Sequence, residues 1–304
     1  MLLIYYRLLI SAWKTFGLRL IFWRWLLFLP LFLLFTHFTL FLDKIFFPQY
    51  QKLQVKNPVF IIGNPRSGTS FLHNLLTQTE DFVAFKTWQI FFPALTARVL
   101  VKPIINYLIR HNLTQMMPES SGHEVYLDRV EHDEFLFVHK LDTQFVLLLS
   151  PLGLDDREYP ELRLYDRQSD SRRYSSVKFF QECLKRQIYY TKKEQVIAHI
   201  HFSTCRIKTL LETFPDAKFI YLVRSPQETI PSHLTLEYNT FKNQKRLNNI
   251  PKAKLQRYFE RRYRYDLELY RYFYELQKKA EIPSENIMVL PYNLLCSDLE
   301  KSFT

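Results

Sequence analysis

Glycine and cysteine are both scarce in this chain of 304 residues. With only 5 glycines, each one is informative about the backbone. The cysteines are odd in number and far apart, at Cys183, Cys205 and Cys296, and no C-x-x-C pair occurs. These features argue against a disulfide framework or a zinc site, and we expect free thiols in a reducing compartment. Internal repeats are also lacking.

Acidic residues are outnumbered by basic ones, so the formal net charge is +11 at pH 7. This excess indicates an anionic partner. Charge alone does not distinguish between a nucleotide, a nucleic acid and an acidic membrane surface. A long helix is predicted over Pro251–Ala280, rich in tyrosine and arginine. We interpret it as an amphipathic helix with a solvated basic face, because its aromatic rings are half-buried by spacing and base stacking needs exposed rings. No nucleic-acid partner is therefore expected.

Residues 1–56 are more hydrophobic than the rest and carry scattered basic residues. Trp25–Leu42 contains no charge, and this length is marginally sufficient to span a bilayer. No A-x-A cleavage site follows, so we do not expect a removed signal peptide. The alternatives are a signal-anchor helix, a re-entrant hairpin, an interfacial amphipathic segment and a buried core helix. We predict membrane association, because a buried helix would usually show caps and a polar face.

From Pro58 onward, apolar runs alternate with helical patterns. Strands are predicted at Pro58–Ile62, Lys218–Val223 and Ile287–Leu290, and helices follow the first two at Thr69–Thr77 and Pro226–Leu236. This alternation predicts an α/β, P-loop-like fold of three layers, with helices on both faces of a mostly parallel sheet. The chain is long enough for one large domain and an appendage, which we assign to residues 57–304 and 1–56.

Less regular stretches lie between these units. Asp155–Ser176 is charged and polar with little periodicity, and we predict a mobile loop or lid there. Gln195–Ala198 is interpreted as a further strand. An acidic cluster, Glu131–Glu134, precedes a run that resembles a strand from Phe135 onward.

The turn after the first predicted strand reads GNPRSGTS over residues 63–70 and holds two of the five glycines. Successive backbone N–H groups in such a turn, with the N-terminus of the next helix, form a cradle for an anion. Arg66 adds positive charge, and hydroxyl groups follow in the first helical turn. The residues predicted to bind phosphate here are Arg66, Ser67, Gly68, Thr69 and Ser70.

This turn differs from the nucleotide-triphosphate P-loop, G-x-x-x-x-G-K-[ST], in a way that matters chemically. Thr69 occupies the lysine position, and the positive charge has moved to Arg66. The strand Lys218–Val223 ends in Arg224, where a magnesium-binding enzyme would carry an aspartate. The site is therefore expected to bind phosphate through cationic and backbone groups, and no metal is expected.

A second motif combines Arg224, at the end of a buried strand, with Ser232 on the next helix. Both can face a crevice at the carboxyl edge of the sheet, where α/β folds bind ligands. A guanidinium group there suits a second phosphate, which it can bind through two hydrogen bonds. Considered alone, Arg224 is better interpreted as part of a structural salt bridge.

Together the two motifs resemble those of the sulfotransferases, most closely the bacterial sulfotransferase-like group. In that family, a strand followed by P-[KR]-S-G-T-[TS] binds the 5′-phosphosulfate of PAPS (3′-phosphoadenosine 5′-phosphosulfate). An arginine and a serine eight residues later bind the 3′-phosphate. Bacterial members also carry segments similar to Asn64–Leu76, Thr204–Val223 and Glu131–Phe135. The resemblance extends, in patches, from Pro58 to Ser297.

The resemblance implies transfer of a sulfuryl group from PAPS to an acceptor hydroxyl or amine, which leaves adenosine 3′,5′-bisphosphate (PAP). Arg66 and the backbone N–H groups of the turn would stabilise charge on the leaving phosphate. A general base is also required. Glu131 is our first candidate and His201 our second. Further candidates are His123, Glu124, Asp133, Glu134 and His199.

Two features depart from the bacterial relatives. A K-N-P-like segment is replaced by His199-Ile200-His201, so the lysine is absent. Relatives generally continue further, so we expect a chain shortened at its C-terminus. These departures keep a second hypothesis open, a non-catalytic, membrane-associated nucleotide-binding protein on a sulfotransferase scaffold. A P-loop kinase or NTPase is a further alternative.

The hydrophobic N-terminal segment suggests that the acceptor is a small or lipid-like molecule. Basic residues before Trp25 favour a cytoplasmic N-terminus. A single span would then separate the α/β domain from cytosolic PAPS, whereas a hairpin or an interfacial segment would not. We therefore predict a protein associated with the cytoplasmic face of a membrane.

Overall fold

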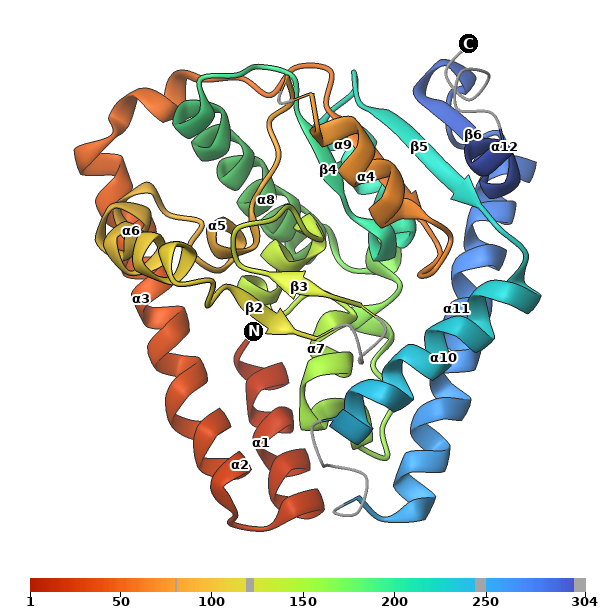
Figure 1. The fold of residues 1–304 in the computed structure, drawn as a ribbon. Helices are drawn as coiled ribbons and strands as arrows, with labels where there is room; N and C mark the ends of the chain where they lie inside the picture. The colour runs from red at the N-terminus through yellow and green to blue at the C-terminus, as the bar shows by residue number, and fades with distance from the viewer. Residues whose placement is uncertain (80, 119–122, 244–249, 298–304) are drawn as a thin grey trace.

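The computed structural model describes residues 1–79, 81–118, 123–243 and 250–297 (Figure 1). Its main sheet has four parallel strands in the order β4-β1-β5-β6. Their bounds are β1 (Val59–Gly63), β4 (Ile197–His199), β5 (Lys218–Val223) and β6 (Ile287–Pro291). The predicted parallel sheet is confirmed. An antiparallel pair, β2 (Gln115–Met117) and β3 (Val125–Tyr126), lies apart from it.

Helices make up most of the remaining described chain, and a π-helix, η1 (Arg24–Phe28), joins α2 to α3. The α-helices are α1 (Leu2–Phe16), α2 (Leu20–Trp23), α3 (Leu29–Phe46), α4 (Thr69–Thr77), α5 (Thr87–Phe91), α6 (Leu95–Arg110), α7 (Phe145–Leu149), α8 (Asp170–Thr191), α9 (Ile207–Thr213), α10 (Pro226–Asn243), α11 (Lys252–Lys278) and α12 (Tyr292–Ser297). The 3₁₀-helices used below are η4 (Asp133–Lys140) and η8 (His201–Arg206).

The central strand β1 shows why the fold has three layers. Its side chains alternate between the faces of the sheet, as in any strand. Phe60 and Ile62 are fully buried against apolar residues of α8, α9 and α11. Ile61 is equally buried, but in a separate core with Leu72 of α4 and Leu295 of α12. A strand covered on both faces needs a continuous apolar run, which is the pattern that predicted it.

The parallel arrangement gathers the carboxyl ends of the strands at one edge. Gly63 at the end of β1 is in register with Leu222 of β5, and Ile61 is in register with His199 of β4. The turn after β1, Arg224 after β5, and His199 and His201 at the end of β4 and just beyond it therefore lie along the same edge.

Two local predictions are wrong. Asp155–Ser176 is ordered: it contains short 3₁₀-helices at Pro160–Leu162 and Tyr165–Arg167 and the start of α8. Tyr165 is 2% exposed, so an aromatic anchor holds this polar segment to the core. The strand-like run after Glu134 is the helix η4.

The N-terminal segment is helical and packs against the α/β domain along one side. Ser11 of α1 donates a hydrogen bond to the backbone oxygen of Pro151 (2.5 Å), and Asp43 of α3 pairs with Arg186 of α8 (2.7 Å). Residues 20–46 form a helical stretch of 27 residues, apolar and long enough to cross a membrane by length and composition, and 28% of its most apolar window is buried. Most of this stretch is therefore not covered by protein. The predicted division at residue 56 stays a prediction.

Candidate functional site

The turn between β1 and α4 depends on backbone conformations that most residues avoid. The φ angle is +141° at Gly63, +68° at Arg66 and +97° at Gly68. A Cβ atom added to Gly63 would lie 2.6 Å from the backbone oxygen of Leu222, and one added to Gly68 would lie 2.6 Å from the ring of Tyr292. Only glycine fits at these two positions, because the φ angles are positive and because the neighbouring atoms leave no room for a Cβ atom.

Asn64 holds this turn in shape. Its backbone oxygen accepts hydrogen bonds from the backbone nitrogen (3.2 Å) and the hydroxyl (2.7 Å) of Ser67. Its side-chain nitrogen donates to the backbone oxygen of Asp266 on α11 (2.9 Å). Thr69 and Ser70 are the first residues of α4, and Gly68 is its N-cap. The N-terminus of α4 therefore opens directly from a rigid turn, the arrangement that binds anions in other proteins.

The two predicted phosphate motifs meet at this edge. The Nε of Arg66 donates to the hydroxyl of Ser232 (3.0 Å), although the two residues are 166 positions apart. The Nη1 of Arg224 reaches the backbone oxygen of Arg66 (3.4 Å). Arg224 also pairs with Glu228 of α10 (3.3 Å), so the structural salt bridge considered as an alternative is present as well. That pair is partly exposed and leaves the guanidinium group next to the turn.

Glu131, the first candidate for the general base, lies among histidines. Its carboxylate is 3.1 Å from Nε2 of His123 and 3.5 Å from Nε2 of His132. Burial tends to raise the pKa of Glu131, but His132 and His123 outweigh this effect and hold its pKa below the usual value.

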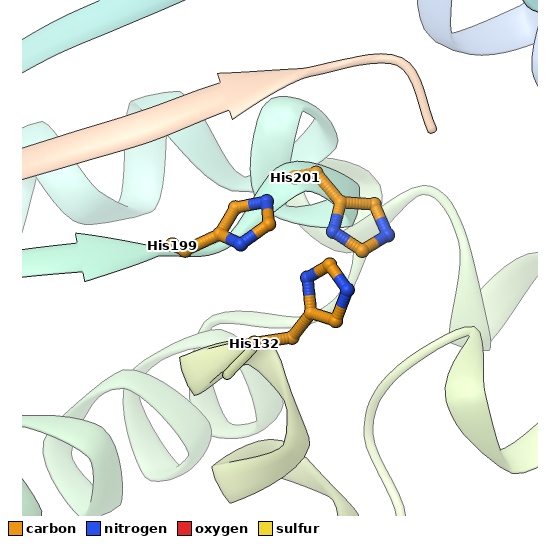
Figure 2. Close-up of side chains that lie close together, drawn as sticks. All are labelled: His132, His199 and His201. Carbon is orange, nitrogen blue, oxygen red and sulfur yellow. The ribbon is translucent and has the colours of Figure 1, made fainter. Parts of the chain in front are cut away.

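His201, the second candidate, is buried in the same cluster (Figure 2). Its ring centroid is 4.8 Å from that of His132 and 5.3 Å from that of His199, and the His132 and His199 centroids are 4.2 Å apart. Burial, followed by the neighbouring histidines, lowers the pKa values of His199 and His201 well below the ordinary value. His132 thus joins Glu131 to His201, a connection that was not anticipated.

The remaining acidic candidates have structural partners. The carboxylate of Asp133 accepts from the backbone nitrogen of His199 (2.7 Å), and that of Glu134 accepts from the backbone nitrogen and hydroxyl of Ser203 (3.1 and 2.7 Å). Burial raises the pKa of Glu134 to about 7. These bonds tie η4 to β4 and η8, which explains why the segment after Glu134 is not a strand.

Comparison with known proteins identifies the family. The sequence profile of the sulfotransferase family matches residues 58–304. The chain belongs to the sulfotransferase family.

Two curated relatives are both described as omega-hydroxy-beta-dihydromenaquinone-9 sulfotransferase Stf3, from Mycobacterium bovis and Mycobacterium tuberculosis. Each is 28% identical over 184 residues, which is 59% of this chain and 45% of the relative. The match therefore covers less than half the length of these relatives.

Two solved sulfotransferases share the fold. STF9 from Mycobacterium avium superposes with a TM-score of 0.64 at 19% identity, over 87% of this chain and 66% of that one. STF1 from Mycobacterium tuberculosis has a TM-score of 0.61 at 15% identity, over 97% of this chain and 78% of that one. The predicted family resemblance and fold class are both confirmed.

In this sulfotransferase-family chain, two tyrosines at the site were not anticipated. The ring of Tyr292 lies 4.3 Å from the guanidinium carbon of Arg224 and also contacts Gly68. The hydroxyl of Tyr270 on α11 donates to the backbone oxygen of Arg224 (2.7 Å). Tyr292 directly follows β6, so its place at the carboxyl edge could have been predicted by the reasoning applied to Arg224. Tyr270 gave no such signal, because it is one of many tyrosines on a long helix.

A cavity of about 740 Å³ lies elsewhere, between α11 and the 158–167 segment. Its lining includes Arg163, Arg167 and Arg271 and none of the predicted site residues. The chemistry of the strand edge, and not cavity size, therefore selects the candidate site.

Proposed function

We propose that this chain transfers a sulfuryl group from PAPS to a hydroxyl group of a lipid-like acceptor. The observation that carries the proposal is the meeting of Arg66, Ser232 and Arg224 beside a glycine-dependent turn at the carboxyl edge of the sheet. Two cationic groups there match a donor with two separate phosphate groups. Membership of the sulfotransferase family supports the same reaction.

The donor would be held at two points. The backbone N–H groups of residues 66 and 68–70 and the hydroxyls of Thr69 and Ser70 would face the 5′-phosphosulfate, with the charge of Arg66 beside them. Both donors of Ser67 bind the backbone oxygen of Asn64 and hold the turn in shape. Arg224 and Ser232 bind the 3′-phosphate. Because Arg66 and Ser232 are already hydrogen-bonded, this part of the site is arranged before the donor arrives.

In the transfer step, the acceptor oxygen forms a bond to sulfur as the bond from sulfur to the phosphate oxygen breaks. The electron pair of that bond stays on the phosphate of PAP. Arg66 and the turn N–H groups stabilise this developing charge, and removing one such donor typically costs about 2.7–4 kcal/mol of barrier. The acceptor proton passes to Glu131 or His201, which the histidine cluster joins through His132.

Two observations support a lipid-like acceptor. The curated relatives are described as acting on an omega-hydroxy menaquinone derivative, a long apolar molecule with a terminal hydroxyl. In this chain, apolar side chains of α3 face outward, with Leu34 67% and Phe38 57% exposed. We propose that residues 1–56 associate with the cytoplasmic face of a membrane and present the domain to acceptors dissolved there.

The test measures thermal stability of the full chain with PAP and then with ATP, each with and without magnesium. A ligand at 100 times its Kd adds about 2.7 kcal/mol of stability, or roughly 5–10 °C in Tm for a domain of this size. We expect a metal-independent shift with PAP that is lost in Arg66→Ala and Arg224→Ala. Arg110→Ala, at an exposed arginine on α6, is the matched control and should keep the shift.

Three results would change the proposal. No shift with PAP would reject the sulfotransferase function for this chain. A shift with ATP that requires magnesium would put a P-loop kinase in its place. PAP binding without sulfate transfer from radiolabelled PAPS to ω-hydroxylated quinones or fatty alcohols would favour a non-catalytic binding protein.

A further inference from the structure

The histidine cluster contains ring nitrogens that lack a hydrogen-bond partner. They are Nδ1 of His132, Nε2 of His199 and Nδ1 of His201, all buried among the residues that the structure describes. His199 is 1% and His201 4% exposed. An unpaired buried nitrogen costs about 1–3 kcal/mol, so three in one place indicate that something else occupies the space between them.

The geometry assigns a binding site for a transition-metal ion, Zn²⁺ by preference, to His132, His199 and His201. One nitrogen from each ring lies within 4.8 Å of the other two, and the rings face one another (Figure 2). Zn–N bonds of about 2.0–2.1 Å place tetrahedral ligands about 3.4 Å apart, so small rotations of the rings close the site around an ion. Imidazole ligands select zinc, copper, iron or nickel over magnesium and calcium.

The backbone already holds the three ligands together. His199 is the last residue of β4 and His201 is the first residue of η8, so the change from strand to helix holds these two ligands two residues apart. His132 is the N-cap of η4. The hydrogen bonds from the backbone nitrogens of His199 and Ser203 to Asp133 and Glu134 fasten η4 to the chain that carries the other two ligands.

The surroundings also suit a cation. Glu131 lies 3.5 Å from Nε2 of His132, on the side of the ring away from the unpaired Nδ1. A carboxylate behind a ligating histidine is the usual outer partner in zinc sites. Asp133 is fully buried, and one of its carboxylate oxygens has no hydrogen-bond partner, while the other lies 3.8 Å from Nε2 of His73. A dication beside these carboxylates would offset the cost of burying them.

This site goes beyond the proposed function and does not depend on it. It also differs from the expectation of a metal-free chain, which rested on cysteine spacing and on the missing Walker lysine. Three histidines leave a fourth position open on zinc for water or an acceptor oxygen, whose pKa the ion would lower. With His201 bound to the ion, Glu131 is left as the candidate proton acceptor.

The experiment removes metal from the full chain by dialysis against a chelator, adds back Zn²⁺, and measures bound zinc by elemental analysis after gel filtration. One ion per chain is expected. His132→Ala and His199→Ala should lose it, and His111→Ala, at an exposed histidine that directly follows α6, should keep it. Glu131→Gln should bind zinc about 10–100-fold more weakly, as loss of an outer partner does.

Cobalt provides a second measurement that needs no variant. Co²⁺ added to the metal-free wild type should give the intense visible absorption of a four-coordinate site and should be displaced by Zn²⁺. His199→Asn, checked by circular dichroism, replaces His199→Ala if that variant does not fold. Substoichiometric zinc, or zinc that persists in both histidine variants, would overturn the assignment and leave buried water as the occupant. PAP-induced stabilisation of the metal-free chain is measured separately, so failure of either proposal can be recognised alone.

Discussion

Single residues at the strand edge show how local geometry constrains the proposed donor site. Gly68 adopts a left-handed backbone and touches the ring of Tyr292, which in turn lies under the guanidinium group of Arg224. A side chain at position 68 would therefore disturb the turn and the second cationic group together. Gly17, which ends α1, also has a positive φ of +64°, but a Cβ atom there would meet nothing within 4 Å.

This contrast gives a matched pair of variants. Gly68→Ala should lower the free energy of unfolding by about 1–3 kcal/mol, from backbone strain and crowding against Tyr292, and should weaken PAP binding at least tenfold. Gly17→Ala should cost only backbone strain, about 1–3 kcal/mol because φ +64° with ψ −157° suits glycine alone, and should leave PAP binding unchanged. Urea unfolding and PAP titration measure both quantities. If the two variants bind PAP alike, the turn does not hold the donor in the way proposed.

At the scale of elements, a buried ionic cluster joins helices α10 and α11. It begins at His233, the residue after Ser232. His233 contacts Asp266 through Nδ1 (2.8 Å) and Glu237 through Nε2 (3.1 Å), and Arg262 pairs with Glu237 (3.0 Å). Two positive and two negative groups thus balance within the interface. This cluster fixes the face of α10 that presents Ser232 to Arg66.

Because of this cluster, the free energy of unfolding should fall when the pH becomes alkaline. Burial tends to lower the pKa of His233, but Asp266 and Glu237 outweigh it and raise the pKa to about 9. The folded pKa lies above the unfolded value of 6.5, so this stabilisation is complete below pH 6.5 and is lost as the pH rises through 9. About 3 kcal/mol is involved.

Urea unfolding at pH 6 and pH 9.5 measures the effect. The wild type and His111→Gln should lose stability between these two pH values. His233→Gln should be less stable than the wild type at pH 6 and should show a smaller loss on going to pH 9.5. An equal loss in His233→Gln would assign the pH dependence to other groups.

Over the whole molecule, α1 to α3 form an arm along one side of the domain (Figure 1). The side of this arm away from the domain exposes apolar side chains. The buried face of α3 includes Leu33 and Asp43, which meet the core and α8. Its outward face is apolar from Leu31 to Phe41, before the exposed Lys44 near its C-terminal end, which supports contact of this stretch with lipid and not with water.

This surface gives a prediction about vesicle binding. Replacing Leu31, Leu34, Phe38 and Phe41 by serine should reduce co-sedimentation with phosphatidylglycerol vesicles at least tenfold, because each buried apolar side chain contributes about 1.5–3 kcal/mol when fully transferred. The control replaces exposed aromatic residues of α11, Tyr263 and Tyr274, by serine and should bind as the wild type does. Equal vesicle binding by both variants would contradict a membrane role for α3.

The sequence by itself determined the main sheet strands and the turn at Gly63–Ser70, and it predicted that Arg224 and Ser232 can face one edge of the sheet. Each of these depends on short-range patterns: an apolar run for a buried strand, two glycines spaced between a strand and a helix, and an arginine at the end of a strand with a serine on the helix that follows. The family resemblance rests on the same local patterns. The binding roles of these residues, and the catalytic roles of Glu131 and His201, stay predictions.

Only the tertiary structure decided what surrounds these motifs. Tyr292 reaches Gly68 because β6 pairs with β5, and His132 meets His199 and His201 because Asp133 and Glu134 bind backbone groups of β4 and η8. The strand expected after Glu134 became a 3₁₀-helix for the same reason. These contacts join residues more than sixty positions apart. Local sequence patterns do not predict them, because the side chains involved meet their partners only when the sheet and its helices assemble.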